Sequence, residues 1–201
     1  MFGKDIVLSD RLFTVLEQSG RRRKFAVEKK PFVTKEQLEE ITKTYPTPFH
    51  LYDEKGIREN ARQLKEAFSW NKGYKEYFAV KATPNPFILN ILKEYGCGTD
   101  CSSMTELMMS KACGFSGNDI MFSSNDTPLE EFAYAAKLGA IINLDDITHI
   151  ECVEQTLGYI PETISCRFNP GGVFKISNDI MDNPGDSKYG MTTEQIFEAF
   201  K

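Results

Sequence analysis

From residue 77 onward, short runs of consecutive apolar residues alternate with longer stretches in which apolar residues recur every three or four positions. The first pattern is typical of strands buried on both faces, and the second is typical of amphipathic helices. The predicted strands start about every 21 residues, at Tyr77, Gly98, Ile120, Ala140 and Thr163. A strand and then a helix, repeated in this way, predicts parallel strands joined by right-handed crossovers.

The predicted helices have recognisable ends. Their starts carry side chains that can accept a hydrogen bond from a free backbone N–H, in three cases as a capping box. These starts lie at Asn85-Pro86, 103–106, 127–130, Asp146 and 192–195. Glycine follows four of the predicted ends, at Gly96, Gly114, Gly139 and Gly158. The α/β class therefore rests on several independent local signals.

Two architectures accommodate this repeat: an eight-stranded (β/α)8 barrel of the TIM type and an open, doubly wound sheet. No Gly-x-Gly-x-x-Gly run follows a predicted strand, and the nearest candidate, Gly96-Cys97-Gly98, precedes one. That is the wrong place for a dinucleotide site, which favours the barrel. Five units are predicted, whereas a complete barrel has eight and about 250 residues. We therefore expect an incomplete barrel, the front part of a longer protein.

The first quarter of the chain has a different pattern. Residues 1–48 are predicted to form a β segment and a short helix, and residues 49–201 the barrel part. Strand-like runs at 13–16 and 24–28 predict a hairpin, and a helix is predicted over 36–43. Residues 49–52 predict a short strand. The helix after it carries four apolar residues on one face, namely Ile57, Ala61, Leu64 and Phe68.

The composition argues against several classes of function. Apolar residues make up 41% and charged residues 26%, which is ordinary for a globular protein, and the net charge of −5 offers no basic surplus for nucleic acid. No apolar run approaches the roughly 20 residues of a membrane span, and no signal-peptide pattern opens the chain. The five cysteines lack CxxC spacing, and the two histidines stand apart from any cluster of metal ligands. We expect reduced thiols, no metal and a cytoplasmic location.

Lys81 is the main candidate for chemistry. It ends the apolar run 77–80, directly before a turn fixed by Pro84 and Pro86. A buried lysine has a lowered pKa and can form a Schiff base, whereas a lysine at a strand end commonly extends its amine into water. Strand alternation predicts Tyr77, Ala79 and Lys81 on one face.

Other polar residues are expected around Lys81. Active sites of such barrels lie at the carboxyl ends of the strands. The polar residues at these ends are Lys81, 100–103, 123–126, Asp145-Asp146 and 167–169. Asp100 and Arg167 are therefore expected near Lys81. The segment 170–191, which is rich in Gly, Asn, Asp and Pro, is long enough to be a lid over this end of the barrel.

The run 77–86, YFAVKATPNP, resembles the cofactor-lysine signature of a decarboxylase family. These pyridoxal-phosphate enzymes act on diaminopimelate, ornithine and arginine and have the alanine-racemase type of barrel. Further runs resemble family landmarks in the same order, at 47–53, 98–107, 167–170 and 187–190. The diaminopimelate branch looks closest. Thr83 departs from the pattern, because the family usually has asparagine there.

The resemblance implies that Lys81 holds pyridoxal 5'-phosphate as a Schiff base, with Asp100 near its nitrogen and Arg167 near the cofactor ring. It implies decarboxylation of a diamino acid, with lysine formed from meso-diaminopimelate, in a homodimer. The family's stacking histidine, glycine-rich phosphate loop, acidic partner of the pyridine nitrogen and carboxyl-terminal β domain would come after residue 201. The 201 residues alone are therefore expected to be inactive.

Two other functions share this fold. In amino-acid racemases an aromatic residue and a glycine usually follow the Lys-Ala-Asn run, where this chain has Pro84-Asn85-Pro86, which disfavours a racemase. A non-catalytic relative could bind a partner and no cofactor. Retention of Lys81 disfavours that alternative, since a binding protein does not need such an amine.

Overall fold

The computed structural model describes residues 30–172 and 189–201 and separates two compact units, Met1–Glu54 and Lys55–Lys201. The first unit contains α2 (Lys35–Thr44), which starts with a capping box between Thr34 and Gln37. This helix confirms the prediction for 36–43. The hairpin predicted at 13–16 and 24–28 lies outside the described residues.

Residues 49–52 are not a strand, contrary to the prediction. Among the described residues, β1 is an edge strand whose neighbour is β2, and no strand pairs with 49–52. An extended segment becomes a strand only where its N–H and C=O groups pair with a second chain segment. The apolar run indicated burial and carried no information about such a partner.

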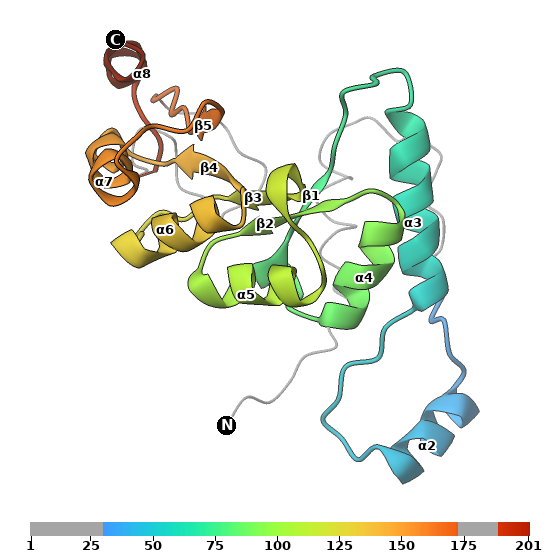
Figure 1. Ribbon diagram of the computed structural model, residues 1–201. Coiled ribbons are helices and arrows are strands. Elements are labelled where there is room, and N and C mark those ends of the chain that lie inside the picture. Colours follow the sequence, from blue (N-terminus) through green and yellow to red (C-terminus); the bar gives the residue numbers. More distant parts are fainter. Residues whose placement is uncertain (1–29, 173–188) are drawn as a thin grey trace. The chain divides into compact units, whose positions relative to one another are not determined.

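Five parallel strands form one sheet in chain order (Figure 1). They are β1 (Tyr77–Ala79), β2 (Gly98–Cys101), β3 (Ile120–Phe122), β4 (Ile141–Leu144) and β5 (Ile164–Cys166). Every observed start lies within one residue of its prediction. Doubly wound sheets reverse their strand order at a switch point, whereas barrels keep consecutive strands adjacent. The observed order confirms the barrel type of fold, with five βα units in the described part.

A helix follows each of the first four strands. These are α4 (Pro86–Glu94), α5 (Met104–Ala112), α6 (Leu129–Lys137) and α7 (Thr148–Leu157), and α8 (Thr193–Ala199) is the last. Figure 1 shows α4, α5 and α6 one after another along the same side of the sheet. Large apolar side chains fill the space between these helices and the strands, among them Leu89, Leu107, Ile120, Phe122, Phe132 and Ile142. This packed layer holds the strand ends in place.

Two of the predicted helix starts are confirmed. Asn85 Oδ1 accepts a hydrogen bond from the Phe87 N–H at 3.0 Å, and a capping box opens α8, where the side chains at 192 and 195 each bond the other's backbone N–H. Helix α7 begins after Ile147, one residue later than the predicted cap Asp146, although Asp146 Oδ1 still accepts a hydrogen bond from the Thr148 N–H at 2.9 Å. Each satisfies a backbone donor that the first helical turn leaves free.

The other two capping boxes are wrong. At the start of α5 the Ser103 hydroxyl donates to Glu106 Oε1 at 3.3 Å and does not accept, and Glu106 bonds the Ser102 N–H instead. At α6 the helix begins one residue later than predicted, with Pro128 as the residue before it. Thr127 is thereby displaced from the capping position, and its buried hydroxyl has no hydrogen-bond partner in the described part of the chain.

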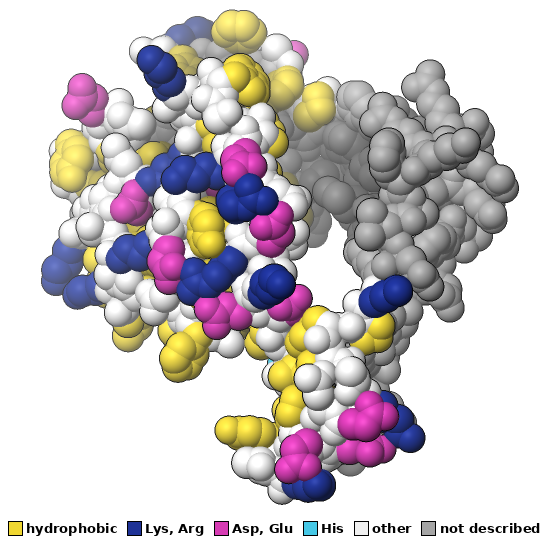
Figure 2. Space-filling model, turned by 90° about the vertical axis from the view of Figure 1, so that its right-hand side faces the viewer, with side chains coloured by type: hydrophobic (Ala, Val, Ile, Leu, Met, Phe, Trp, Pro, Cys, Tyr) yellow, Lys and Arg dark blue, Asp and Glu magenta, His cyan; other side chains and the backbone are white. Residues whose placement is uncertain are grey.

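Helix α3 (Glu54–Ala67) presents a charged outer face. Arg62 bonds Glu59 and Glu66 on its own helix, and Arg58 bonds Glu94 of α4 at 2.5 Å. Figure 2 shows side chains of both signs interspersed over this side. The predicted apolar face is only partly covered: Ala61 is buried, whereas Leu64 and Phe68 are exposed.

Among the described residues, none of the helices combines the length and the apolar character needed to cross a membrane.

Candidate active site

The carboxyl ends of the strands surround a cavity of about 480 Å³. Lys81 follows β1, Asp100 belongs to β2, Ser123 follows β3, Asn143 belongs to β4 and Arg167 follows β5. All five line this cavity, whose size is that of a small-molecule site. The structure therefore brings together Lys81, Asp100 and Arg167, the residues singled out from the sequence.

Lys81 has the predicted place but a different conformation. The strand ends at Ala79, and Val80–Ala82 forms a 3-10 turn that is closed by the Thr83 N–H donating to the Val80 carbonyl at 3.1 Å. Strand alternation therefore stops before Lys81. Val80 is fully buried, whereas Lys81 is exposed, so of the two alternatives left open by the sequence the structure shows a lysine whose side chain extends from the strand end. The side chain reaches the cavity from its rim.

Asp100 is the carboxylate nearest the centre of this arrangement. Partial burial raises its pKa, and a hydrogen bond from Ser123 Oγ at 2.5 Å acts in the opposite direction. The positive charges of Lys81 and Arg167 also lower the pKa of Asp100. The net effect is a pKa of Asp100 above its ordinary value, with burial as the largest cause, while both cations of the cavity act on this carboxyl group to lower the pKa.

Arg167 is held by two contacts. Its Nη1 donates to Asp145 Oδ1 at 2.8 Å, and its guanidinium lies over the ring of Tyr189, 5.4 Å from the centroid. Gly190 lies against its aliphatic stem, with φ at +84°, and a Cβ there would be 3.2 Å from Arg167 Cγ. Only glycine suits both that backbone conformation and that close approach.

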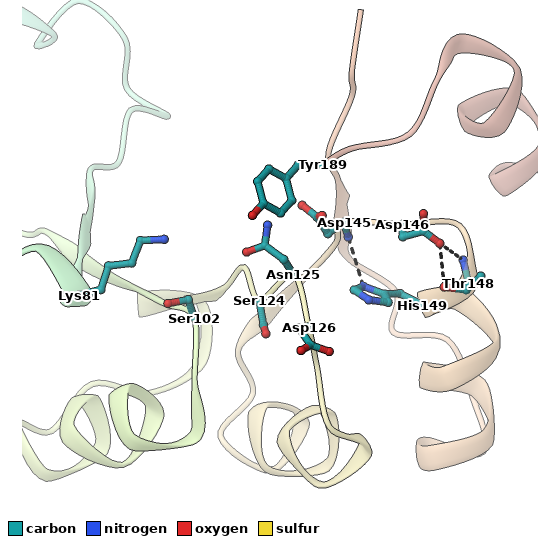
Figure 3. A pocket seen from close by; sticks show the side chains of 10 residues that line it. All are labelled: Lys81, Ser102, Ser124, Asn125, Asp126, Asp145, Asp146, Thr148, His149 and Tyr189. Carbon is teal, nitrogen blue, oxygen red and sulfur yellow. Dashed lines mark hydrogen bonds between the residues drawn. The ribbon is translucent and has the colours of Figure 1, made fainter. Parts of the chain in front are cut away.

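A second cavity of about 590 Å³ shares Lys81, Asn125 and Tyr189 with the first. Figure 3 shows Tyr189 and Asn125 between Lys81 on one side and Asp145 on the other. The far wall is His149, whose Nδ1 accepts a hydrogen bond from the Asp145 N–H at 3.3 Å. Because Nδ1 accepts, the imidazole carries its proton on Nε2.

Several residues of the site were not predicted. Asn143 and Ser165 line the first cavity and bond each other at 2.8 Å, and His149 lines the second. Asn143 and Ser165 are polar residues within otherwise apolar strands, which is the one signal that could have found them. His149 lies within an amphipathic helix, where the sequence pattern does not distinguish it. The segment predicted as a lid lies outside the described residues from 173 to 188.

In the described ranges, no group of three or more histidine, cysteine, aspartate or glutamate side chains is arranged to hold a metal ion. All five cysteines are free thiols.

Residues 54–201 match the family model described as pyridoxal-dependent decarboxylase, pyridoxal binding domain. The chain belongs to this family. Protein TabA of Pseudomonas amygdali pv. tabaci is 40% identical over 164 residues, which are 82% of this chain and 38% of TabA. Diaminopimelate decarboxylase of Helicobacter pylori strain J99 is 34% identical over 166 residues, 81% of this chain and 40% of that enzyme. This decarboxylase-family chain thus spans about two fifths of the length of these relatives.

Solved structures agree with the fold. The crystal structure of diaminopimelate decarboxylase from Helicobacter pylori complexed with L-lysine superposes with a TM-score of 0.72 at 31% identity. The match covers 81% of this chain and 42% of that one. Lysine decarboxylase from Selenomonas ruminantium superposes at 0.58 with 22% identity, over 64% of this chain and 34% of that one. That second likeness concerns the fold. The fold of this family member is the alanine-racemase type of barrel, incomplete in the chain described.

The residues present fit pyridoxal phosphate. A Schiff base with its aldehyde requires a primary amine that opens onto a cavity of ligand size, and Lys81 meets both conditions. Asp100 and Ser123 supply a carboxylate and a hydroxyl in the same cavity. The donor set is therefore compatible with the cofactor of this decarboxylase family.

Proposed function

We propose that this chain forms one side of the pyridoxal phosphate site of an amino-acid decarboxylase, with Lys81 as the residue that holds the cofactor. The observation that carries the proposal is the single cavity lined by Lys81, Asp100 and Arg167. When bound, the cofactor supplies an electron sink for the electron pair that remains on the α-carbon after carbon dioxide leaves.

Each of these residues has a distinct role in the proposal. Lys81 would hold the cofactor through its primary amine, and its Nζ at the rim of the cavity would be placed to move a proton. Asp100 stabilises positive charge on Lys81 Nζ. Ser123 fixes the Asp100 carboxylate by donating to its Oδ1. Arg167 supplies the second positive charge of the cavity.

Borohydride reduction of the full-length protein loaded with cofactor is expected to fix a phosphopyridoxyl group on Lys81, which peptide mass spectrometry will identify. Hydride reduces a Schiff base and leaves free amines unchanged. Lys93 is an internal control, because its Nζ is held by the carbonyl oxygens of Cys113 and Gly114. A label on any other peptide would remove Lys81 from the cofactor site.

We propose meso-diaminopimelate as the substrate and L-lysine as the product. The support comes from two matches: diaminopimelate decarboxylase of Helicobacter pylori strain J99, which is 34% identical, and the crystal structure of a Helicobacter pylori diaminopimelate decarboxylase complexed with L-lysine, which is 31% identical. The 40% identity to protein TabA favours a second candidate, a different amino acid decarboxylated at the same site.

A panel of substrates separates these two candidates. We expect kcat/KM for meso-diaminopimelate to exceed the values for L-lysine, L-ornithine and L-arginine by about a hundredfold or more, because a site with buried polar partners rejects analogues that leave them unpaired. Carbon dioxide release from the full-length protein is the measurement. A preference for another amino acid would establish the second candidate, and no release from any of the four would count against both.

The proposal also covers the cellular compartment of the protein, its oligomeric state and the boundary of its barrel domain. We place the protein in the cytoplasm as a homodimer, with residues 1–48 as an N-terminal segment and the barrel from residue 49. The five free thiols support a reducing compartment.

A further inference from the structure

Four charged residues lie at the carboxyl ends of the strands, two of each sign: Lys81 after β1, Asp100 in β2, Asp145 after β4 and Arg167 after β5. Lys81, Asp100 and Arg167 line the same cavity, and the two positive charges act to lower the pKa of Asp100. Arg167 in turn forms an ion pair with Asp145 at 2.8 Å. The two carboxylates therefore have Arg167 in common, and its position decides how much of the Asp100 charge is left for Lys81.

Asp145 is the fixed member of this series. Its N–H donates to His149 Nδ1 at 3.3 Å, and its carbonyl accepts from the Gly190 N–H at 3.1 Å. The residue is 3% exposed, and a buried carboxylate is stable only with a partner of opposite charge. The Arg167 side chain, by contrast, is 47% exposed, so less packing restrains it than restrains Asp145.

We propose that Asp145 is a positioning residue that holds the Arg167 guanidinium on the β4 side of the cavity, so that Asp100 remains the counter-ion of Lys81. The inference rests on the proposed function, because it assigns Asp145 a role through the lysine that holds the cofactor. A guanidinium released from Asp145 would pair with the next carboxylate in reach, since arginine binds carboxylates through two parallel hydrogen bonds. In this cavity that carboxylate is Asp100.

The test measures the Lys81 amine directly, in the full-length protein without cofactor. Acetic anhydride acetylates only unprotonated amines, and mass spectrometry gives the acetylation rate of Lys81 at neutral pH. In Asp145→Asn the released Arg167 neutralises Asp100, so the Lys81 ammonium loses its counter-ion and acetylation is expected to rise about three- to tenfold. Asp145→Glu keeps the charge and is expected to restore the rate to within about twofold of wild type.

The variant Arg167→Met distinguishes two explanations for an effect of Asp145→Asn on Lys81. The effect can come from the changed position of Arg167 or from a general destabilisation of the protein. Without Arg167, Asp100 pairs with Lys81 alone, so acetylation is expected to slow. Adding Asp145→Asn to Arg167→Met is expected to have no further effect, because the two substitutions act through one contact. Asp119→Asn is the matched control: it removes an aspartate paired with Lys75 at the amino end of β3 and is expected to leave the Lys81 rate unchanged.

An unchanged rate in Asp145→Asn would overturn the inference, as would an equal effect with and without Arg167. If Asp145→Asn does not fold, Arg167→Met decides alone, and faster acetylation of Lys81 in that variant would contradict the proposal. The proposed function is tested separately by borohydride in the loaded protein. The two can therefore fail independently.

Discussion

Lys81→Ala is expected to lower kcat for decarboxylation by about a thousandfold or more, with the fold intact. The variant lacks the amine that forms the covalent link to the cofactor and exchanges with the amino acid. Because the Lys81 side chain is exposed in the described structure, its removal leaves no cavity in the packed core. Carbon dioxide release and the thermal unfolding midpoint are measured on the same preparations.

Two further measurements make this result specific. Lys137→Ala removes an exposed lysine in the last turn of α6 and is expected to retain wild-type activity. Methylamine added to Lys81→Ala is expected to restore part of the rate, because a small primary amine can occupy the space that the side chain leaves. Activity within about tenfold of wild type in Lys81→Ala would exclude covalent catalysis by this residue.

The strands were predictable because local composition decides them. Each apolar run is bounded by glycine, proline or a helix start. These boundaries determine at which residue the strand begins. Gly98 illustrates the limit of local information: a Cβ at this position would lie 2.6 Å from the Asp119 carbonyl oxygen. The sequence indicates that glycine begins this strand, whereas the neighbour that excludes every other residue is visible only in three dimensions.

The failed capping boxes have the same cause. The N–H of Met104, at the start of α5, donates to Glu131 Oε1 at 2.9 Å, and Glu131 belongs to α6. A side chain 27 residues away thus satisfies a donor at the helix start. Spacing along the chain predicts which groups need partners, and the packing of one helix against the next determines which partners they receive.

The candidate site was predictable in outline for a different reason. The carboxyl ends of parallel strands lie at the same edge of the sheet. Their last residues therefore lie close together for any conformation of the loops. This brought Lys81, Asp100 and Arg167 to one cavity as expected. The pairing was not predictable, because Arg167 bonds Asp145 on the adjacent strand. Exposure of Lys81 was one of two alternatives that the sequence left open, but the 3-10 turn that carries this lysine was not predicted, because the apolar pattern cannot distinguish it from two more residues of strand.

The second large effect concerns stability and involves Phe132 of α6. This side chain is 1% exposed and packs edge-on against Phe122 of β3, with ring centroids 6.1 Å apart. It also packs against His149 of α7 at 5.5 Å. Phe132 therefore connects the sheet and two helices, and it supports the imidazole that bonds the backbone of Asp145.

Phe132→Ala is expected to lower the free energy of unfolding by about 3–5 kcal/mol, because it removes a buried aromatic ring and leaves a cavity among three elements. Urea unfolding of the full-length protein, followed by circular dichroism, measures the change. Phe132→Leu keeps most of the volume and is expected to cost less than about 1.5 kcal/mol.

Phe87→Ala removes the same ring from a position that is 81% exposed, at the start of α4, and is expected to change the stability by less than about 0.5 kcal/mol. Both substitutions remove the same side chain, so a difference between their effects on the free energy of unfolding reports the burial of Phe132. Equal losses at both positions would mean that α6 does not pack on the sheet through Phe132. His149 would then lack its support, and the fixed position of Asp145 would need another explanation.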